Sequence, residues 1–154
     1  MNYKKILSQL NKKPRVNGYI NPKTRTKLSP IHGLGLFALK NISKGTIVAV
    51  WGGRVTTKKE VEALPRDISF HYALELYPGF YLAERKMSEL DSADFINHSC
   101  QPNCKIVRKF LMLTKKDIGK SEELTADFSN HGSSGEKFEC HCGAKNCKKI
   151  IYFN

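Results

Sequence analysis

The stretch DFINHSCQPNC, residues 94–104, is the most informative segment of the chain. In it, an apolar Phe-Ile pair is followed at once by Asn97 and His98, and the segment ends with Cys100 and Cys104. On its own, an Asn-His pair is typical of a turn or of hydrogen-bonded core side chains. The chain has three other cysteines besides the two in this segment.

Those cysteines lie near the C-terminus, in ECHCGAKNC at residues 139–147. Cys140 and Cys142 are one residue apart, a spacing that does not easily meet the restricted geometry of a disulfide. Around the turn that follows, Cys140, Cys142 and Cys147 can all point at one ion. Clustered cysteines in an intracellular chain favour a metal site over disulfides. The competing interpretation is three free thiols on a mobile tail.

A structural zinc site usually has four ligands, most often thiolates, so three local cysteines leave one place to fill. Either Cys100 or Cys104 must reach that place from a distant segment, which would tie the C-terminal tail to the core. His141 is a further candidate ligand, although its side chain should point away from the two cysteines beside it.

The composition predicts one folded domain and no membrane association. The chain has 154 residues, of which 40% are hydrophobic, enough for a real core. Its longest apolar runs, such as residues 47–51, are far too short to span a bilayer. The N-terminus is basic but lacks the apolar run and cleavage site of a secretory signal. We therefore expect a cytoplasmic protein, bacterial by default, with delivery into a host nucleus left open.

The formal net charge is +12, which favours contact with polyanions but does not identify a fold. The lysines and arginines are spread along the chain and are densest within residues 1–27. Two interpretations stay open. One is an ordinary solvated, lysine-rich surface, and the other is a contact surface for nucleic acid or a nucleosome.

Short apolar stretches separated by turn signals predict a β-rich single domain. The expected strands are 33–39, 46–53, 69–76 and 79–84, with one or two more in 105–114.

Other elements are expected between and before these strands. A Pro-Gly pair at 78–79 predicts a hairpin. One helix is expected at 57–64, where Thr57 and Glu60 form a capping box and Pro65 ends the helix. Residues 1–15 are expected to be a polar, partly helical arm.

Five motifs follow one another along the chain: SPIHGLGLFALKNISKG (29–45), VWGGRV (50–55), DFINHSCQPNC (94–104), EELTADF (122–128) and CHCGAKNC (140–147). Each is weak alone. Together and in this order, they resemble the SET-domain family of protein-lysine methyltransferases. The resemblance is greatest to compact, stand-alone members of bacterial type with a C-terminal zinc-binding extension, and it covers residues 27–151, nearly the whole chain.

The resemblance implies a mostly β, β-clip-like fold with several small sheets and a C-terminal pseudoknot, followed by a short zinc-binding tail. It divides the chain into a basic N-terminal arm (1–26), a SET domain (27–130) and a post-SET zinc-binding segment (131–154). Because this fold threads its C-terminal segment through a loop, the segments around Asn97 and Thr125 are expected to meet beside the GLGLFA backbone.

The resemblance also implies transfer of a methyl group from S-adenosylmethionine to a lysine of a protein or peptide, with histones among the candidates. The residues expected to contact the methyl donor are Gly33, Leu34, Gly35, Leu36, Asn97 and His98. Structural zinc would be held by Cys140, Cys142, Cys147 and, by resemblance, Cys100. Cys104 would then remain a free, buried thiol.

The chemistry of this reaction depends on a neutral amine held in line with the methyl group. A lysine has an ordinary pKa of about 10.4, and a narrow apolar channel lowers it. A strong general base is then not obligatory, and alignment within the channel becomes the main requirement. Aromatic walls suit such a channel because they shape it and favour cationic products.

Three positions depart from the family pattern at the expected channel. Phe128 stands where the family carries a tyrosine, Ala126 stands where it carries Phe or Tyr, and Trp51 replaces another tyrosine. Tyr72 or Tyr81 could supply the missing hydroxyl, although most strand tyrosines are packing residues. The candidate catalytic residues are Trp51, Tyr72 and Phe128.

Three functions from different classes are therefore compared. The first is an active protein-lysine methyltransferase. The second, suggested by Phe128 and Ala126, is a SET fold with impaired catalysis that acts as a binding module. The third is a basic zinc protein that binds nucleic acid. The order of the motifs favours the first, and the target protein and the number of methyl groups added stay open.

Overall fold

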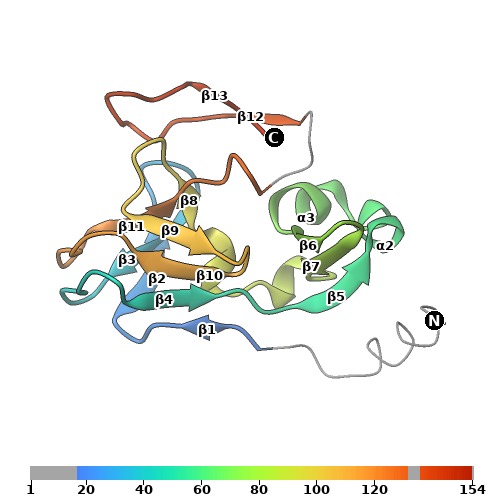
Figure 1. Ribbon diagram of the computed structural model, residues 1–154, viewed down its shortest axis with the longest axis horizontal. Coiled ribbons are helices and arrows are strands. Elements are labelled where there is room, and N and C mark those ends of the chain that lie inside the picture. Colours follow the sequence, from blue (N-terminus) through green and yellow to red (C-terminus); the bar gives the residue numbers. More distant parts are fainter. Residues whose placement is uncertain (1–16, 132–135, 154) are drawn as a thin grey trace.

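The computed structural model describes residues 17–131 and 136–153, which form four small β-sheets and a few short helices (Figure 1). The expected mostly β class is thereby confirmed. The expected N-terminal helical arm, residues 1–15, lies outside the described residues. Within the described part, no helix has the length and apolar character needed to cross a membrane.

The first sheet has the strand order β1-β4-β10-β9 and is antiparallel throughout. Its strands are β1 (Tyr19–Ile20), β4 (Ile47–Val50), β9 (Cys104–Val107) and β10 (Leu111–Thr114). The expected segment 105–114 therefore forms two strands joined by a tight connection.

The second sheet has the order β2-β3-β11-β8. Its strands are β2 (Thr24–Leu28), β3 (Leu34–Ala38), β8 (Asn97–His98) and β11 (Glu123–Ala126). β8 pairs with β11 in parallel, with Asn97 opposite Thr125, while β3 pairs antiparallel with the other side of β11. The three segments expected to meet do lie side by side. Strands β1 and β2 lie mostly within the span expected as an N-terminal arm.

A third sheet, β5-β7-β6, lies with the helices on one side of the molecule (Figure 1). Its strands are β5 (Arg54–Thr57), β6 (Leu74–Tyr77) and β7 (Phe80–Ala83). The α-helices are α2 (Lys58–Glu62) and α3 (Arg66–His71), and the 3-10 helices are η1 (Met87–Glu89) and η2 (Ser92–Phe95).

Local sequence explains most of the elements in the region formed by this sheet and the helices. The Thr57–Glu60 capping box is present at the start of α2, and the expected hairpin joins β6 to β7. The expectation of a strand over 69–76 is wrong for residues 69–71, which belong to α3. Pro65 ends one helix and its carbonyl accepts from the N–H of Ile68 and Ser69, so it also begins the next.

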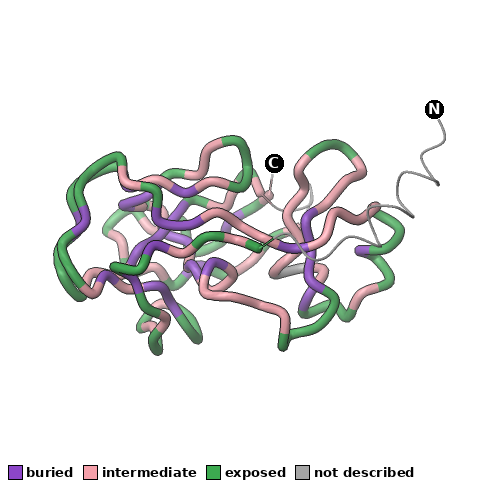
Figure 2. The backbone as a smooth tube through the Cα atoms, turned by 90° about the horizontal axis from the view of Figure 1, so that it is seen from below, coloured by how far each residue is buried: buried purple, intermediate pink, exposed green. Residues whose placement is uncertain are grey.

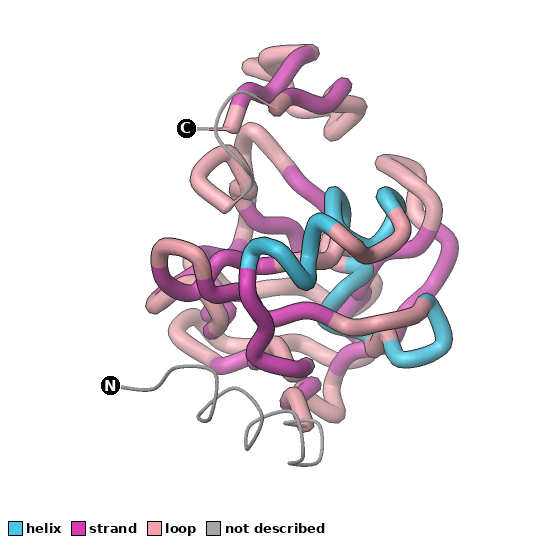
Figure 3. Tube along the Cα trace, turned by 90° about the vertical axis from the view of Figure 1, so that its right-hand side faces the viewer, coloured by secondary structure: helices cyan, strands magenta, loops and turns pink. Residues whose placement is uncertain are grey.

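The C-terminal segment forms the hairpin of β12 (Lys137–Glu139) and β13 (Ile150–Tyr152). Figure 3 shows this hairpin as a separate layer at one end of the molecule, beyond the strands of the two larger sheets.

The core lies between the two four-stranded sheets. Leu36, Val48, Met112 and Leu124 have no exposed surface and belong to one cluster. They come from β3, β4, β10 and β11, so both sheets contribute. Figure 2 shows the buried stretches of the backbone. Burying each such side chain stabilises the fold by about 1.5–3 kcal/mol. This core fixes the sheet edges that carry the functional residues.

Candidate active site and cysteine cluster

Asn97 holds the meeting point of β3, β8 and β11 together. Its Nδ2 donates to the carbonyl of Leu34 at 2.9 Å and lies 3.2 Å from that of His32. The same amide donates to Glu123 Oε1 at 2.8 Å. The side-chain amide of Asn97 therefore shapes the loop before β3, in addition to any contact with a ligand.

The Glu123 carboxylate is the other half of this junction. It also accepts from the hydroxyl of Ser29, at 2.8 and 2.9 Å. Gly35 lies directly against it, because a Cβ at residue 35 would overlap Glu123 Oε1. Gly33 has φ +47° and open space around it, so there glycine serves the backbone conformation. The two glycines of the GLGL motif thus have different physical roles.

His98 connects this junction to the cysteines. Its Nδ1 accepts from the N–H of Phe128 at 3.1 Å, which leaves the proton on Nε2, and Nε2 lies 3.5 Å from Cys100 Sγ. Burial lowers the pKa of His98 and outweighs the opposing effect of Asp127. The 3.6 Å approach of Asp127 to Nδ1 is therefore not an ion pair at neutral pH.

Four cysteines converge from two distant segments. The Sγ atoms of Cys100, Cys140, Cys142 and Cys147 all lie within 4.8 Å of one another. Thiolates bound to a tetrahedral zinc at about 2.3 Å lie about 3.8 Å apart, and Cys100 Sγ lies 3.8 Å from Cys140 Sγ. The cluster can hold a metal ion. His141 is not part of it, and its side chain is exposed beside Glu139.

The surroundings act differently on the thiols of this cluster, because burial raises the pKa of Cys100 and Cys140. Burial also disfavours the charged form of Cys142, but hydrogen bonds from the N–H groups of Cys100 and Ala144 and from the neighbouring thiols outweigh burial and lower its pKa to about 6. The N–H of Lys148 donates to Cys100 Sγ at 3.4 Å. Burial also raises the pKa of the Cys104 thiol, to about 12. As expected, Cys104 is a buried free thiol.

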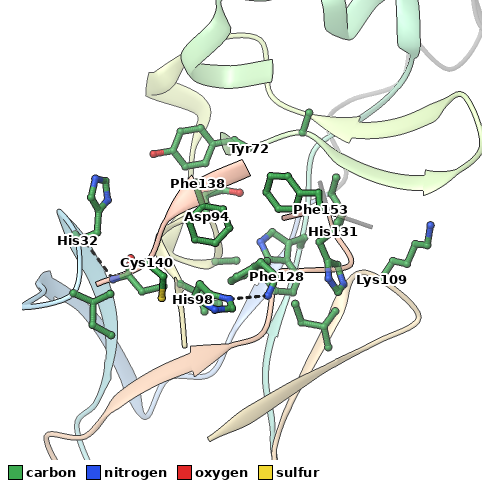
Figure 4. Close-up of a pocket in the computed structure, with 18 of the residues that line it drawn as sticks. His32, Tyr72, Asp94, His98, Lys109, Phe128, His131, Phe138, Cys140 and Phe153 are labelled. Carbon is green, nitrogen blue, oxygen red and sulfur yellow. Dashed lines mark hydrogen bonds between the residues drawn. The ribbon is translucent and has the colours of Figure 1, made fainter. Parts of the chain in front are cut away.

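A cavity of about 430 Å³ lies beside this junction, within the range of about 300–1,000 Å³ typical of small-molecule sites. Its wall is mainly apolar and includes the aromatic residues Trp51, Tyr72, Phe128, Phe138 and Phe153, and Figure 4 labels the last four of them.

The cavity also has polar groups at its wall. His32, Asn97 and His98 contribute from the β3–β8 junction, and Glu139 and His141 contribute from the C-terminal hairpin. The wall therefore joins the β-sheet core to the segment that carries three of the clustered cysteines.

Phe128 lies at the centre of a chain of edge-to-face aromatic contacts. Its ring centroid is 6.2 Å from that of Trp51 at an interplanar angle of 82°, and 5.9 Å from that of His131 at 79°. The His98 ring in turn lies 5.4 Å from that of Phe138, also edge-to-face. Such edge-to-face pairs are favourable beyond the area that they bury, so they hold the wall in shape.

The sequence-based candidates fall into two groups. Trp51, Tyr72 and Phe128 line the cavity together with Asn97 and His98. The described lining contains Ile31 and His32 but not Gly33, Leu34, Gly35 or Leu36, and Leu36 is completely buried. A contact of this motif with a ligand would therefore involve backbone atoms, and it stays a prediction.

Two further sequence-based candidates lie away from the cavity wall. Neither Tyr81 nor Ala126 is among the described residues that line it, and Ala126 is fully buried in the core. Of the two tyrosines considered for a replacement hydroxyl, the structure places Tyr72 at the cavity.

Sequence reasoning missed His131, Phe138 and Phe153, which all line the cavity. They lie in or next to the C-terminal segment, where the cysteines were the visible signal. Two aromatic residues at the ends of a short hairpin are ordinary in sequence, and their approach depends on how the cysteine cluster folds the tail back.

The comparisons with known proteins agree with this geometry. Residues 33–129 match the model of the SET domain family, and the chain belongs to that family. A relative from Schizosaccharomyces pombe, named histone-lysine N-methyltransferase, H3 lysine-4 specific, is 34% identical over 135 residues. A protein of the same name from Saccharomyces cerevisiae is 33% identical over 159 residues. Histone-lysine N-methyltransferase ash1 of Drosophila melanogaster is 29% identical over 131 residues.

The matches extend over most of this chain but over a small part of each relative. They cover 80% of the chain for the S. pombe protein, 94% for the S. cerevisiae protein and 77% for ash1. The corresponding shares of the relatives are 14%, 14% and 6%. The matched segment thus spans about one seventh or less of the length of these relatives.

Proposed function

We propose that the protein transfers a methyl group from S-adenosylmethionine to a lysine side chain of a protein. One observation carries the proposal: a single cavity is lined both by the Asn97–His98 pair, held beside the GLGL strand, and by the aromatic residues Trp51 and Phe128. A site of this kind can receive a polar donor at one side and an aliphatic amine at the other. Membership of the SET domain family supports the same reaction.

The residues present fit a sulfonium methyl donor. A cationic centre gains from aromatic faces, which Trp51, Phe128 and Phe138 offer, while His32 and Asn97 offer polar groups. When bound, the donor supplies an electrophilic methyl group. The chain's own contribution is to hold the donor and the amine in line and to exclude water, which brings reacting groups close to attack distance.

The aromatic wall acts on the lysine in two ways. An apolar surrounding disfavours the ammonium form and lowers the lysine pKa, so more of the amine is neutral and can attack. The Trp51 and Phe128 rings, held at 6.2 Å, can also guide the aliphatic stem toward the cavity. The lost tyrosine hydroxyl at position 128 leaves these effects in place, because the aromatic ring remains.

We also propose that the metal held by the four cysteines is structural zinc. The support is the all-thiolate donor set, typical of structural zinc, together with the sulfur spacing. The ion would fix the C-terminal hairpin to Cys100, and thereby place Phe138 and Phe153 at the cavity. Measurement of bound metal by mass spectrometry should give about one zinc per chain, falling in Cys100→Ser.

A histone tail is the first substrate to test, because relatives carry histone-lysine names. The +12 net charge supports an additional contact with nucleic acid or a nucleosome, which would weaken steeply with salt. An acidic partner protein would suit the same charge.

The direct test incubates the purified protein and a radiolabelled methyl donor with histones or a cell lysate. Label on protein lysines is expected, and Asn97→Ala should lose it because the junction of β3, β8 and β11 loses its anchor. A well-folded protein that binds the donor yet labels no lysine contradicts the proposal.

A further inference from the structure

His131 is a base at the cavity wall that none of the roles above uses. It follows the end of the ADF segment, and its ring packs edge-on against Phe128 with centroids 5.9 Å apart. The N–H of His131 donates to the Phe128 carbonyl at 3.0 Å, which fixes the backbone between them. Figure 4 shows His131 next to Phe128 and near Phe153. The ring is thus held at the aromatic end of the cavity, where the amine is expected.

The Nδ1 atom of His131 is buried and has no hydrogen-bond partner in the described part of the chain. Buried polar atoms without a partner are rare, and each requires an explanation such as a ligand or a catalytic role. Because Nδ1 is enclosed, an N–H group entering the cavity would reach the ring at Nε2, which accepts a hydrogen bond when the proton is on Nδ1.

The other bases at the wall are already engaged or exposed. His98 uses Nδ1 for Phe128 and Nε2 for Cys100. Asp94 accepts from the N–H of Asp91 at the start of η2, and Glu139 is exposed beside His141. His32 is exposed. Among the described bases at the wall, His131 is therefore the one whose position and half-buried ring best suit an amine.

The surroundings keep this ring neutral at pH 7. Burial lowers the pKa of His131 and outweighs the opposing effect of Asp127, and Lys109 adds a smaller lowering effect. A neutral imidazole has one nitrogen that donates and one that accepts, so the ring can receive an N–H from a substrate.

We propose that the imidazole of His131 accepts a hydrogen bond from the target amine and is the first acceptor of the proton that the lysine ammonium must lose. This assignment rests on the proposed function. It makes His131 a catalytic residue, because it touches the reacting amine and orients its lone pair toward the sulfonium methyl group.

The step balances without a further reagent. The lysine ammonium gives one proton to the imidazole, leaving a neutral amine and an imidazolium. The amine lone pair forms the new N–C bond as the C–S bond breaks, and the electron pair of that bond returns to sulfur. The imidazolium then releases its proton to water. The transfer is feasible because burial can bring a lysine pKa down to about 5–6, close to that of a histidine.

The kinetic test compares wild type with His131→Phe, which keeps a ring but removes the acceptor, and His131→Gln, which keeps an acceptor. Single-turnover rates at saturating donor should fall about 100-fold in His131→Phe and be partly restored in His131→Gln. The ratio of wild-type to His131→Phe rates should be constant above the pKa of His131 and approach one below it. Taking a ratio cancels the titration of the substrate lysine. A ratio near one at every pH overturns the proposal.

A second test does not depend on turnover. Histidine rings labelled with ¹³C are observed by NMR in the presence of S-adenosylhomocysteine, with n-butylamine as a probe for the lysine side chain. The His131 resonance, assigned by its loss in His131→Gln, should shift saturably, and the His131 pKa should fall further. Tetramethylammonium, a cation without an N–H, should cause no such shift.

The two tests separate the two claims. No response of the His131 resonance to n-butylamine contradicts the amine contact, even if the protein methylates lysine. A clear response in a protein that methylates no lysine supports the contact and refutes the proposed function. Thermal unfolding of each variant identifies any loss of rate that is caused by misfolding.

Discussion

Substitution of Gly35 by alanine should disrupt the junction on which the site is built. A Cβ at this position would overlap Glu123 Oε1 and lie 2.8 Å from Glu123 Cδ and 3.0 Å from Ser29 Cβ. The carboxylate must therefore move away, and it would give up its hydrogen bonds with Ser29 and Asn97.

The size of the effect follows from those bonds. Each hydrogen bond to a charged group contributes about 1.5–3 kcal/mol, so losing two costs about 3–6 kcal/mol. Replacing glycine by alanine within a strand returns about 0.5–1 kcal/mol. The free energy of unfolding should thus fall by about 2–5 kcal/mol in Gly35→Ala. For a chain of this size, Tm should fall by about 5–20 °C.

Urea and thermal unfolding measure this change, with Gly119→Ala as the matched control. At Gly119, the nearest atom to an added Cβ is Glu122 Oε2 at 3.9 Å, so a change within about 0.5 kcal/mol is expected. In a Glu123→Ala background, most of the Gly35→Ala penalty should disappear, because the overlapping carboxylate atoms are gone and only the contact with Ser29 Cβ at 3.0 Å remains. Equal effects of Gly35→Ala and Gly119→Ala, or a penalty unchanged without Glu123, would refute the reasoning.

Three further outcomes are expected. In metal-free protein at pH 7, iodoacetamide should modify Cys142 first, because its pKa of about 6 makes it largely thiolate. Cys104 and Cys140 should react slowly, because both are buried and burial raises the pKa of both thiols. Peptide mass spectrometry after timed quenching shows the order, and early labelling of Cys104 would contradict it. The free energy of unfolding should decrease between pH 7.5 and pH 5.5, because burial lowers the pKa of His131 below its usual 6.5 and the unfolded chain therefore binds more protons than the folded chain. Urea titrations at the two pH values should show a smaller decrease for His131→Phe than for wild type. Equal decreases in the two proteins would count against a neutral His131 ring. Phe128→Tyr should change turnover of a labelled methyl donor little, because the aromatic wall is already formed. A large rise in turnover over an inactive wild-type protein would instead support the binding-module interpretation.

Much of the fold could be predicted because its signals are local. The Thr57–Glu60 capping box is a feature of four adjacent residues, and the hairpin at 78–79 is marked by proline and glycine. The meeting of the three motif segments was predicted by family resemblance, and the pairing of β8 with β11 confirms it.

The remaining errors arise where the local signal is ambiguous. Residues 69–71 were expected in a strand, yet they complete α3, which begins just after Pro65 and buries Ile68. The turn between β9 and β10 was not located, because Arg108 and Lys109 adopt positive φ there without the glycine or asparagine that usually marks it.

A site residue could be predicted where its role is visible in the local sequence, and not where the role depends on packing against distant residues. The cysteine spacing left Cys100 and Cys104 as alternatives, and packing decides between them: Cys104 is in the core and Cys100 joins the cluster. His131 could not be found from sequence, because its significance comes from packing against Phe128 and from a ring nitrogen that has no partner among the described residues. Both features exist only after the chain has folded.

The most direct measurement incubates the purified protein and S-adenosylmethionine with an array of lysine-containing peptides that includes histone tails, and locates methylated residues by mass spectrometry. We predict methyl groups on lysine nitrogen in the presence of wild-type protein and their absence with Asn97→Ala. Saturable binding of the donor with every peptide left unmodified, across pH 7 to 9, would contradict the assignment of this cavity to lysine methylation.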